Sequence, residues 1–260
     1  MTRLLACLSL LNANTSFAQS PLAYTAAHLD CARFAETSHS DITTQTARGE
    51  VKATVDRAGV LSFRARDTTG GIAVESWYDS LAIRRRTGES EVAADTDGLI
   101  GGRYRGVLTA SGGYTEIARP FFPDEVAEVA DLSGAVRDLL PPLPPRPLAP
   151  GEQWTERGVV LQRLPDTTVA GSRLVHLRLQ SRSDTGQTIL QGDTMPIPLR
   201  QTTEESGRVY WSTATGFVRR TRDITVEATI PSGGPIRQAV RSRVTQRVEL
   251  TRLPARPSCK

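Results

Sequence analysis

Histidine, the side chain that most often acts as a catalytic base or a metal ligand, is rare in this sequence. The 260 residues include three histidines, His28, His39 and His176. None lies in the HExxH, HxH or cysteine–histidine spacing of a zinc site, and a Gly-x-Ser-x-Gly elbow is absent. A Ser–His–Asp triad would have to recruit His176 across the fold. We therefore predict no metal site, no catalytic residue, and a structural or solvent-facing role for His176.

Carboxylates form no recognisable site either. Residues 95–98 read Asp-Thr-Asp-Gly, like the start of a calcium loop, but Gly106 stands where the distal glutamate ligand belongs, so we predict a turn. Glycosidases need two carboxylates held about 5–10 Å apart, and the sequence does not give that separation. We predict no cofactor, and a hydrolase with a site not recognisable from sequence stays an alternative. Further carboxylates lie in predicted turns: Asp166, Asp184, Asp193, Glu204 and Glu205.

The basic residues do not predict a nucleic-acid partner. Of the 32 Lys and Arg residues, only Lys52 and Lys260 are lysines, and the net charge is +4. Arginine in place of lysine is typical of a GC-rich genome. The three arginines within residues 219–222 have only Phe217 nearby, whereas single-strand binders interleave several aromatic side chains with their basic ones.

The first 18 residues have the layout of a secretory signal. Arg3 supplies the positive charge, residues 4–11 the apolar stretch, and residues 16–18 (Ser-Phe-Ala) the cleavage motif before Gln19. We predict cleavage after Ala18 and a secreted or periplasmic protein. No later stretch approaches the roughly 20 apolar residues of a membrane helix, so we predict no transmembrane segment after cleavage.

Export makes the cysteines informative. Cleavage would remove Cys7, which would instead be a lipidation site if the true start lies upstream. It would leave Cys31 and Cys259, and two cysteines in an oxidising compartment predict one disulfide. Closing so long a loop is worth about 5 kcal/mol in the chain-entropy model. The alternative is two free thiols.

Residue periodicity in the first half predicts one helix followed by strands. Helical spacing over residues 21–36 predicts a short N-terminal helix that carries Cys31. From Gly49 the period changes to two, which predicts a hairpin with its turn at residues 56–59. Further strands follow the glycine pairs at residues 70–71, 101–102 and 112–113.

Residues 123–154 separate the two strand-rich halves. The apolar residues Val126, Val129, Leu132, Val136 and Leu139 fall on one helical face, and Pro141 ends the predicted helix. The proline strap at residues 141–146 matches the PxxPx(Arg) pattern of SH3 ligands. We interpret it as a rigid crossover that Trp154 packs against.

The second half alternates strongly. Val175, Leu177 and Leu179 are expected on one face of a strand, with a turn at residues 184–186. Two prolines predict that residues 195–199 form an edge strand or a loop.

The last hairpin is the clearest prediction. Centring its turn on Gly233 pairs Val226 with Val240 inward and Asp223 with Arg243 outward. The inward residues form an apolar concave face that we predict to bind a ligand: Val226, Val240, Val244 and Val248.

A resemblance adds to these patterns. The run Leu-Pro-x-x-Pro-Leu-x-Pro-Gly-x-x-Trp-Thr at residues 143–155, with the glycine-bounded strand at residues 207–216, resembles a group of uncharacterised exported bacterial β-rich proteins. The resemblance implies export and a sheet-rich fold, with no catalytic residues to carry over. By fold analogy, the predicted elements are similar to lipoprotein-carrier-like half-barrels, whose concave sheet holds acyl chains.

These observations predict a mainly β protein: an antiparallel sheet, open or half-barrel, with one N-terminal and one internal short helix. Residues 19–260 are expected to form a single domain, with sheet-forming halves at about 40–120 and 151–253 joined by the crossover at 123–151. The function we expect is a non-enzymatic envelope or periplasmic protein that binds a partner or ligand on a curved sheet. The partner would be a small apolar ligand, as in a lipid or lipoprotein carrier, or an envelope protein.

Overall fold

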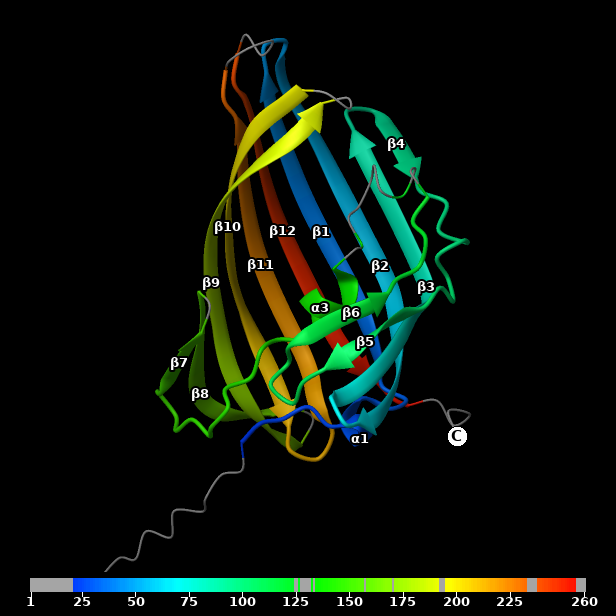
Figure 1. Ribbon diagram of the computed structural model, residues 1–260, viewed down its shortest axis with the longest axis vertical. Coiled ribbons are helices and arrows are strands. Elements are labelled where there is room, and N and C mark those ends of the chain that lie inside the picture. Colours follow the sequence, from blue (N-terminus) through cyan, green and yellow to red (C-terminus); the bar gives the residue numbers. More distant parts are fainter. Residues whose placement is uncertain are drawn as a thin grey trace, which may run out of the picture.

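A computed structural model of the protein describes residues 21–123, 126, 132, 134–156, 158–169, 171–191, 195–232 and 238–255. Its strands form one open antiparallel sheet (Figure 1), which confirms the predicted fold class. The order is β6-β5-β3-β2-β1-β12-β11-β10-β9-β8-β7, and β4 pairs with β3 outside this path. The twelve strands are β1 (Arg33–Thr46), β2 (Gly49–Thr68), β3 (Gly71–Thr87), β4 (Ser90–Ala93), β5 (Tyr104–Leu108), β6 (Tyr114–Ala118), β7 (Gln153–Glu156), β8 (Val159–Val169), β9 (Ser172–Gln191), β10 (Met195–Ser212), β11 (Gly216–Ile230) and β12 (Val240–Leu253).

The two halves of the chain meet at the centre of the sheet. Strand β1 pairs with β12 from Arg33 opposite Leu253 to Gln45 opposite Arg241. The first half supplies β1–β6 and the second half β7–β12. This pairing satisfies two long strand edges that each half would otherwise expose.

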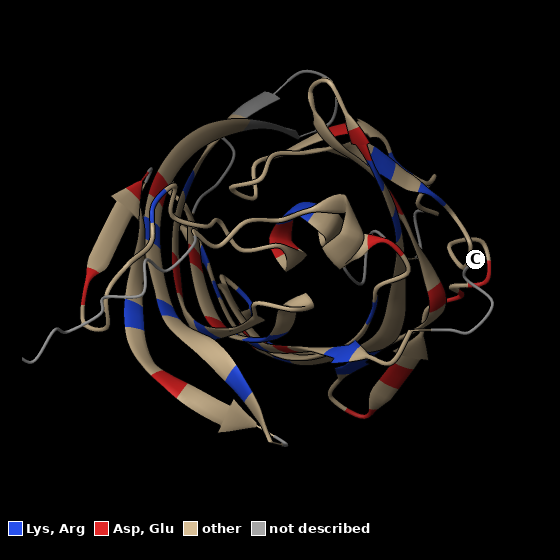
Figure 2. Ribbon diagram, turned by 90° about the horizontal axis from the view of Figure 1, so that it is seen from below, with Lys and Arg blue, Asp and Glu red and all other residues tan. Residues whose placement is uncertain are grey.

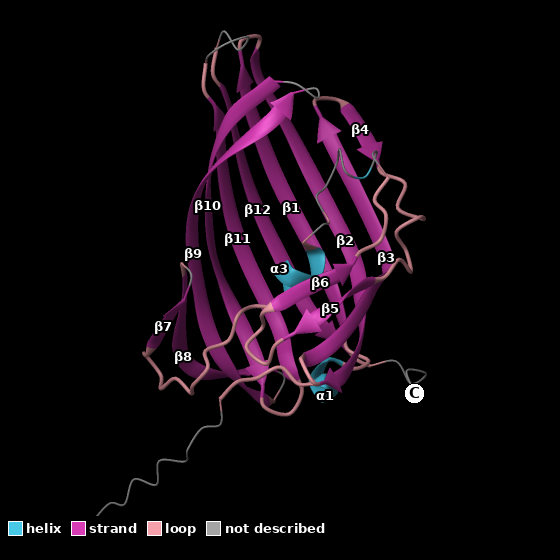
Figure 3. Cartoon of the chain, viewed as in Figure 1, coloured by secondary structure: helices cyan, strands magenta, loops and turns pink. Residues whose placement is uncertain are grey.

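The sheet curves around the crossover that links the halves. Helix α3 (Ala135–Leu139) lies inside the curve, as the view along the strands shows (Figure 2; strands and helices are distinguished in Figure 3). Its Val136 and Leu139 join a core to which both halves contribute, including Phe63 and Val209. Helix α1 (Ala26–Leu29) is capped by Thr25 Oγ1, which accepts the backbone N–H of His28 at 3.1 Å.

The proline strap is fixed by contacts with segments distant in sequence. Tyr24 Oη donates to the carbonyl of Pro141 at 2.8 Å, and the N–H of Leu143 donates to the carbonyl of Ser111 at 2.8 Å. Gly112 has φ +92, and a Cβ there would lie 2.7 Å from the oxygen of Pro141. The close approach of the strap therefore requires glycine at this turn.

The N-terminal helix is shorter than predicted. Only Ala26–Leu29 is helical, and β1 begins at Arg33. Asp30 leaves the helical region with ψ 129, and Cys31 follows with φ 59. The alanine-rich pattern fits a strand equally well, and Phe34 is fully buried on the concave side of β1.

The turn predicted at residues 56–59 is wrong, because β2 continues through it. A Cβ on Gly59 would lie 2.8 Å from the carbonyl oxygen of Ser80. Glycine is present there because two backbones approach closely. The register between β2 and β3 shifts one residue later, between Val60 and Leu61, and such a shift bends a strand.

The turn predicted at residues 184–186 is also wrong. Strand β9 runs through them, and a Cβ on Gly186 would meet nothing within 4 Å. The prediction for the two prolines is confirmed: residues 195–199 form an edge segment, because they pair with β9 whereas pairing with β11 starts at Arg200.

The register predicted for the last hairpin is wrong by four residues. Val226 pairs with Val244, and Asp223 with Arg247. The connection between Ile230 and Val240 is longer than the five-residue turn assumed from the sequence. A shift by an even number of residues keeps every side chain on its predicted face.

The internal helix does not run unbroken to Leu139 as predicted, because Leu132 lies outside any helix. Gly134, placed mid-helix by the sequence pattern, is the N-cap of α3. Four predicted apolar positions are buried nonetheless, while Val129 lies outside the described residues: Val126, Leu132, Val136 and Leu139.

Several N-terminal and C-terminal predictions fall outside the described residues. These are the signal at residues 1–18, Cys7, and Cys259 of the predicted disulfide with Cys31. They stay predictions, as does the single-domain assignment. Within the described part of the chain, no helix is long and apolar enough to cross a membrane.

Candidate functional site

The lower part of the concave face is filled. Side chains on this face lie in rows across neighbouring strands, as the strand register requires. At the level of α3, Phe34, Leu250 and Val209 are each at most 2% exposed. They pack in one core with Val136 and Leu139 of α3, so these side chains leave no room for a ligand beside the helix.

The upper part of the concave face is different. One row there runs from Ile42 on β1 through Val244 on β12 to Val226 on β11. Two rows further along the strands, Val240 pairs with Ile230, and the row between them is formed by Thr44, Ser242 and Ala228. All five valine and isoleucine side chains are only partly buried. We call these five residues the upper concave face.

The four valines predicted as ligand contacts fall on the predicted side of the sheet. Val240, Val244 and Val248 follow one another at intervals of four residues on β12, and Val226 lies opposite Val244. Val248 is 3% exposed and belongs to the filled core. The other three belong to the upper concave face.

A buried charge network lies between the two parts. Arg222 makes two hydrogen bonds to Glu205, from Nε at 2.8 Å and from Nη2 at 2.9 Å. Arg220 adds a third at 2.7 Å. Near the end of α3, the carbonyl of Asp138 accepts from Arg220 at 2.7 Å and from Arg222 at 3.0 Å. Carbonyls at a helix end lack intrahelical partners.

The network keeps its charges despite burial. Burial disfavours ionisation of Glu205, but the hydrogen bonds and charges of Arg222 and Arg220 outweigh it and lower the pKa of Glu205. Burial, helped by the charge of Arg222, lowers the pKa of Arg220 to about 10, so Arg220 is protonated at neutral pH. Glu205 lies within β10, so the turn predicted for it is wrong.

A second buried polar group lies on the other side of the concave face. Arg57 on β2 is ion-paired with Glu36 on β1, and Tyr78 on β3 donates to Glu36 at 3.1 Å. Burial, and then the charge of Glu36, raise the pKa of Tyr78 well above its ordinary value. The phenol is therefore a neutral hydrogen-bond donor.

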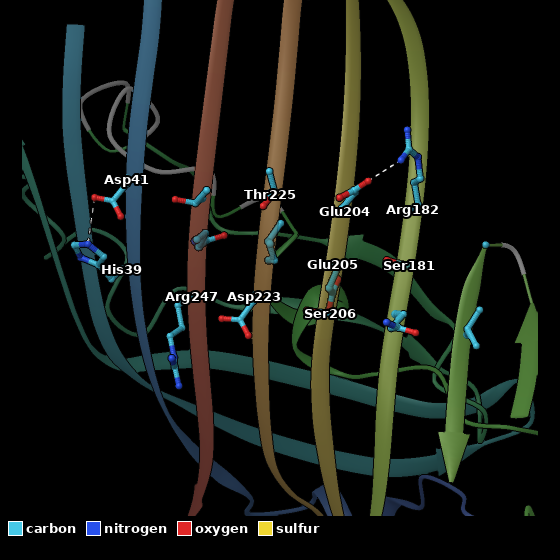
Figure 4. A pocket seen from close by; sticks show the side chains of 16 residues that line it. His39, Asp41, Ser181, Arg182, Glu204, Glu205, Ser206, Asp223, Thr225 and Arg247 are labelled. Atoms are coloured by element: carbon cyan, nitrogen blue, oxygen red, sulfur yellow. Dashed lines mark hydrogen bonds and ion pairs between the residues drawn. The ribbon is translucent and has the colours of Figure 1, made fainter. Parts of the chain in front are cut away.

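The convex face carries a polar pocket of about 600 Å³ (Figure 4). His39 lies at one end, with Nδ1 2.7 Å from Asp56 and Nε2 3.6 Å from Asp41. The hydrogen bond with Asp56 is the main cause of the raised pKa of His39. Asp223 and Arg247 line the pocket on β11 and β12. Sequence reasoning missed this group, although His39 and Asp41 sit two residues apart, as side chains on one strand face do.

His176, the histidine singled out from the sequence, has a different environment. Its ring stacks on Tyr210 with centroids 4.8 Å apart and planes 9° apart. Burial and then the charge of Arg208 lower its pKa, and its Nε2 is buried with no hydrogen-bond partner among the described residues. A neutral imidazole packed against tyrosine and near arginine is a structural side chain.

The described residues hold no group of three or more His, Cys, Asp or Glu side chains that could bind a metal ion. The polar groups above make ion pairs and hydrogen bonds with one another. Two of them anchor elements, and the third lines the convex pocket.

Comparisons with known proteins give only distant likenesses. No protein-family model matches the sequence, and no curated protein is significantly similar to it. Among solved structures, Neisserial surface protein A is 7% identical, with 85% of this chain and 97% of that chain covered and a TM-score of 0.25. A DUF1329 family protein from Desulfovibrio piger is 8% identical (84% and 85% covered, TM-score 0.19). A putative outer membrane lipoprotein-sorting protein domain from Vibrio parahaemolyticus is 8% identical (87% and 85% covered, TM-score 0.17). Likeness at this level does not indicate a shared function.

Proposed function

We propose that this is an exported, non-enzymatic envelope or periplasmic protein that binds a ligand with an apolar chain on the upper concave face. The observation that carries the proposal is the row of Ile42, Val244 and Val226, whose side chains are only partly buried on the inside of a curved sheet. Apolar side chains left partly open on a concave surface favour an apolar ligand. Export rests on the signal pattern of residues 1–18.

The polar groups below the upper concave face support a binding role. Glu205, Arg220 and Arg222 bond to one another and to the crossover. Their hydrogen bonds hold the carboxylate and the end of α3 in place, which is the arrangement of an anchor. They act as a rigid floor under the bound chain.

Native mass spectrometry of the purified protein tests the proposal directly. We expect a co-purifying fatty acid or lipid, and saturable binding of cis-parinaric acid by the stripped protein. A protein that carries no apolar molecule and leaves cis-parinaric acid unbound contradicts the proposal, and a polypeptide found instead would favour the partner-binding alternative.

A matched pair of double variants locates the site. Val226→Thr with Val244→Thr removes apolar surface from the upper concave face and should weaken cis-parinaric acid binding on the order of tenfold. The control, Thr225→Val with Thr245→Val, changes the cross-strand pair next to it on the convex face. Equal affinity of the two double variants would mean that the ligand binds elsewhere.

A further inference from the structure

Two large apolar side chains stand out on the surface at the β6 edge of the sheet. Phe121 is 82% exposed and Ile117 is 70% exposed, the highest values among the large apolar side chains described. Ile117 belongs to the edge strand β6, and Phe121 follows three residues after that strand ends. Isolated apolar side chains are common on surfaces, but a pair on a free sheet edge invites association.

Local structure explains why both side chains point outward. Glu116 pairs with Gly106 and Ala118 with Arg105, so Ile117 is the extra residue of a β-bulge, and a bulge re-aims its side chain. Phe122 packs on Tyr104, with ring centroids 6.2 Å apart. The core therefore holds the second ring of the Phe121–Phe122 pair and leaves the first in solvent.

Ion-paired arginines lie near Ile117. Arg105 is 63% exposed and its partner Glu75 30%. Arg119, between the two apolar residues in sequence, is 52% exposed and its partner Glu116 35%. In both ion pairs the guanidinium is the more accessible charge. Ile117 lines a depression of about 670 Å³, in which three arginines (Arg64, Arg66 and Arg105) outnumber two carboxylates (Asp30 and Glu75).

We propose that Ile117, Phe121, Arg105 and Arg119 form a docking surface for an anionic lipid bilayer, which we call the β6 patch. Aromatic and aliphatic side chains enter the boundary between headgroups and acyl chains, and arginines bind the phosphates there. Arg105 alternates along β5 with Tyr104 and Leu108, which are buried in the core, so docking would set the outer face of this edge of the sheet (Figure 1) against the bilayer.

Vesicle co-sedimentation tests the β6 patch without reference to any bound ligand. The purified protein should bind vesicles of phosphatidylglycerol and phosphatidylcholine, and bind vesicles of phosphatidylcholine alone much more weakly. The double variant Ile117→Ser with Phe121→Ser should lose on the order of 100-fold in affinity, about tenfold for each apolar side chain. Arg119→Gln should lose about fivefold, on anionic vesicles only.

Val92→Ser is the matched control, because Val92 is 55% exposed on β4, away from β6. Its vesicle affinity should equal that of the unmodified protein. Equal binding by the double variant, or no preference for anionic vesicles, overturns the proposal. A third result would also overturn it: the protein binds no vesicles, associates with itself, and loses this self-association in the double variant. The patch would then be a contact between copies of the chain.

Discussion

Arg220 shows how one buried side chain connects the sheet to the crossover. It donates to two successive carbonyls at the end of α3, those of Asp138 and Leu139, and to the carboxylate of Glu205. A buried ion pair contributes little net stability compared with an apolar replacement of both partners, whereas removing one partner leaves an uncompensated charge. Arg220 therefore acts chiefly by fixing where the crossover lies.

Replacing Arg220 with methionine should destabilise the fold by about 3–5 kcal/mol, because Glu205 loses a partner and two carbonyls of α3 lose their donor. Urea unfolding measures this change. The control is Arg219→Met, one residue away on the convex face. There the ion pair with Glu249 is 46% and 36% exposed, and the loss should stay below about 1 kcal/mol. A loss of similar size in both variants would contradict the anchoring role.

His39 gives the convex pocket a pH dependence with a defined sign. Its raised pKa means that the folded protein favours the protonated ring. This contribution is present below the ordinary pKa of 6.5 and is lost as the pH rises through the folded value. The unfolding free energy should therefore fall across that range, and His39→Gln should remove this part of the fall.

An NMR titration of the His39 ring measures the pKa directly. Asp56→Asn should lower it most, because that hydrogen bond at 2.7 Å is the main cause of the shift. Asp41→Asn, at 3.6 Å from Nε2, should lower it less. The reverse order would show that the ring is oriented differently in solution.

At the scale of elements, two glycines in long strands look alike in sequence and differ in structure. Both Gly59 and Gly186 were predicted to lie in turns, and both lie within strands. A Cβ would lie 2.8 Å from Ser80 O at Gly59 and would meet nothing within 4 Å at Gly186. Only the first glycine is required by packing.

Gly59→Ala should therefore cost about 1–3 kcal/mol, because the neighbouring backbone must move to accept the methyl group. Gly186→Ala should be neutral or stabilise by up to about 1 kcal/mol, since it restricts the unfolded chain. Thermal or urea unfolding of both variants checks the contrast. Equal effects would mean that β2 and β3 can separate locally without cost.

These elements also show how far the sequence could predict the fold. Alternation placed Val226, Val240, Val244 and Val248 on the right face, because face depends only on whether residue numbers are odd or even. It did not predict the register of the hairpin, nor that Gly59 lies within a strand, since both depend on contacts across strands. The contact of Arg220 with α3 was equally out of reach, because Arg220 is more than 80 residues from Asp138 and Leu139 in sequence.

At the scale of the whole molecule, β1 and β12 bring distant parts of the chain together. Their pairing joins the two halves along thirteen residue pairs, from Arg33–Leu253 to Gln45–Arg241. The crossover then packs Val136 and Leu139 against residues of both halves. We propose on these grounds that residues 19–260 form a single domain.

A single domain should unfold in one transition. Trp77 lies in β3 of the first half and Trp211 in β10 of the second. Two variants each keep one of these tryptophans and have the other two replaced by phenylalanine. Within each variant, the fluorescence of the remaining tryptophan should give the same urea midpoint as far-UV circular dichroism. Trp211 is 2% exposed, so its replacement will lower the midpoint itself, and the comparison is made between probes of one variant. Separate transitions for the two probes would show that the β1–β12 junction opens before either half unfolds, and that the halves are independent folding units.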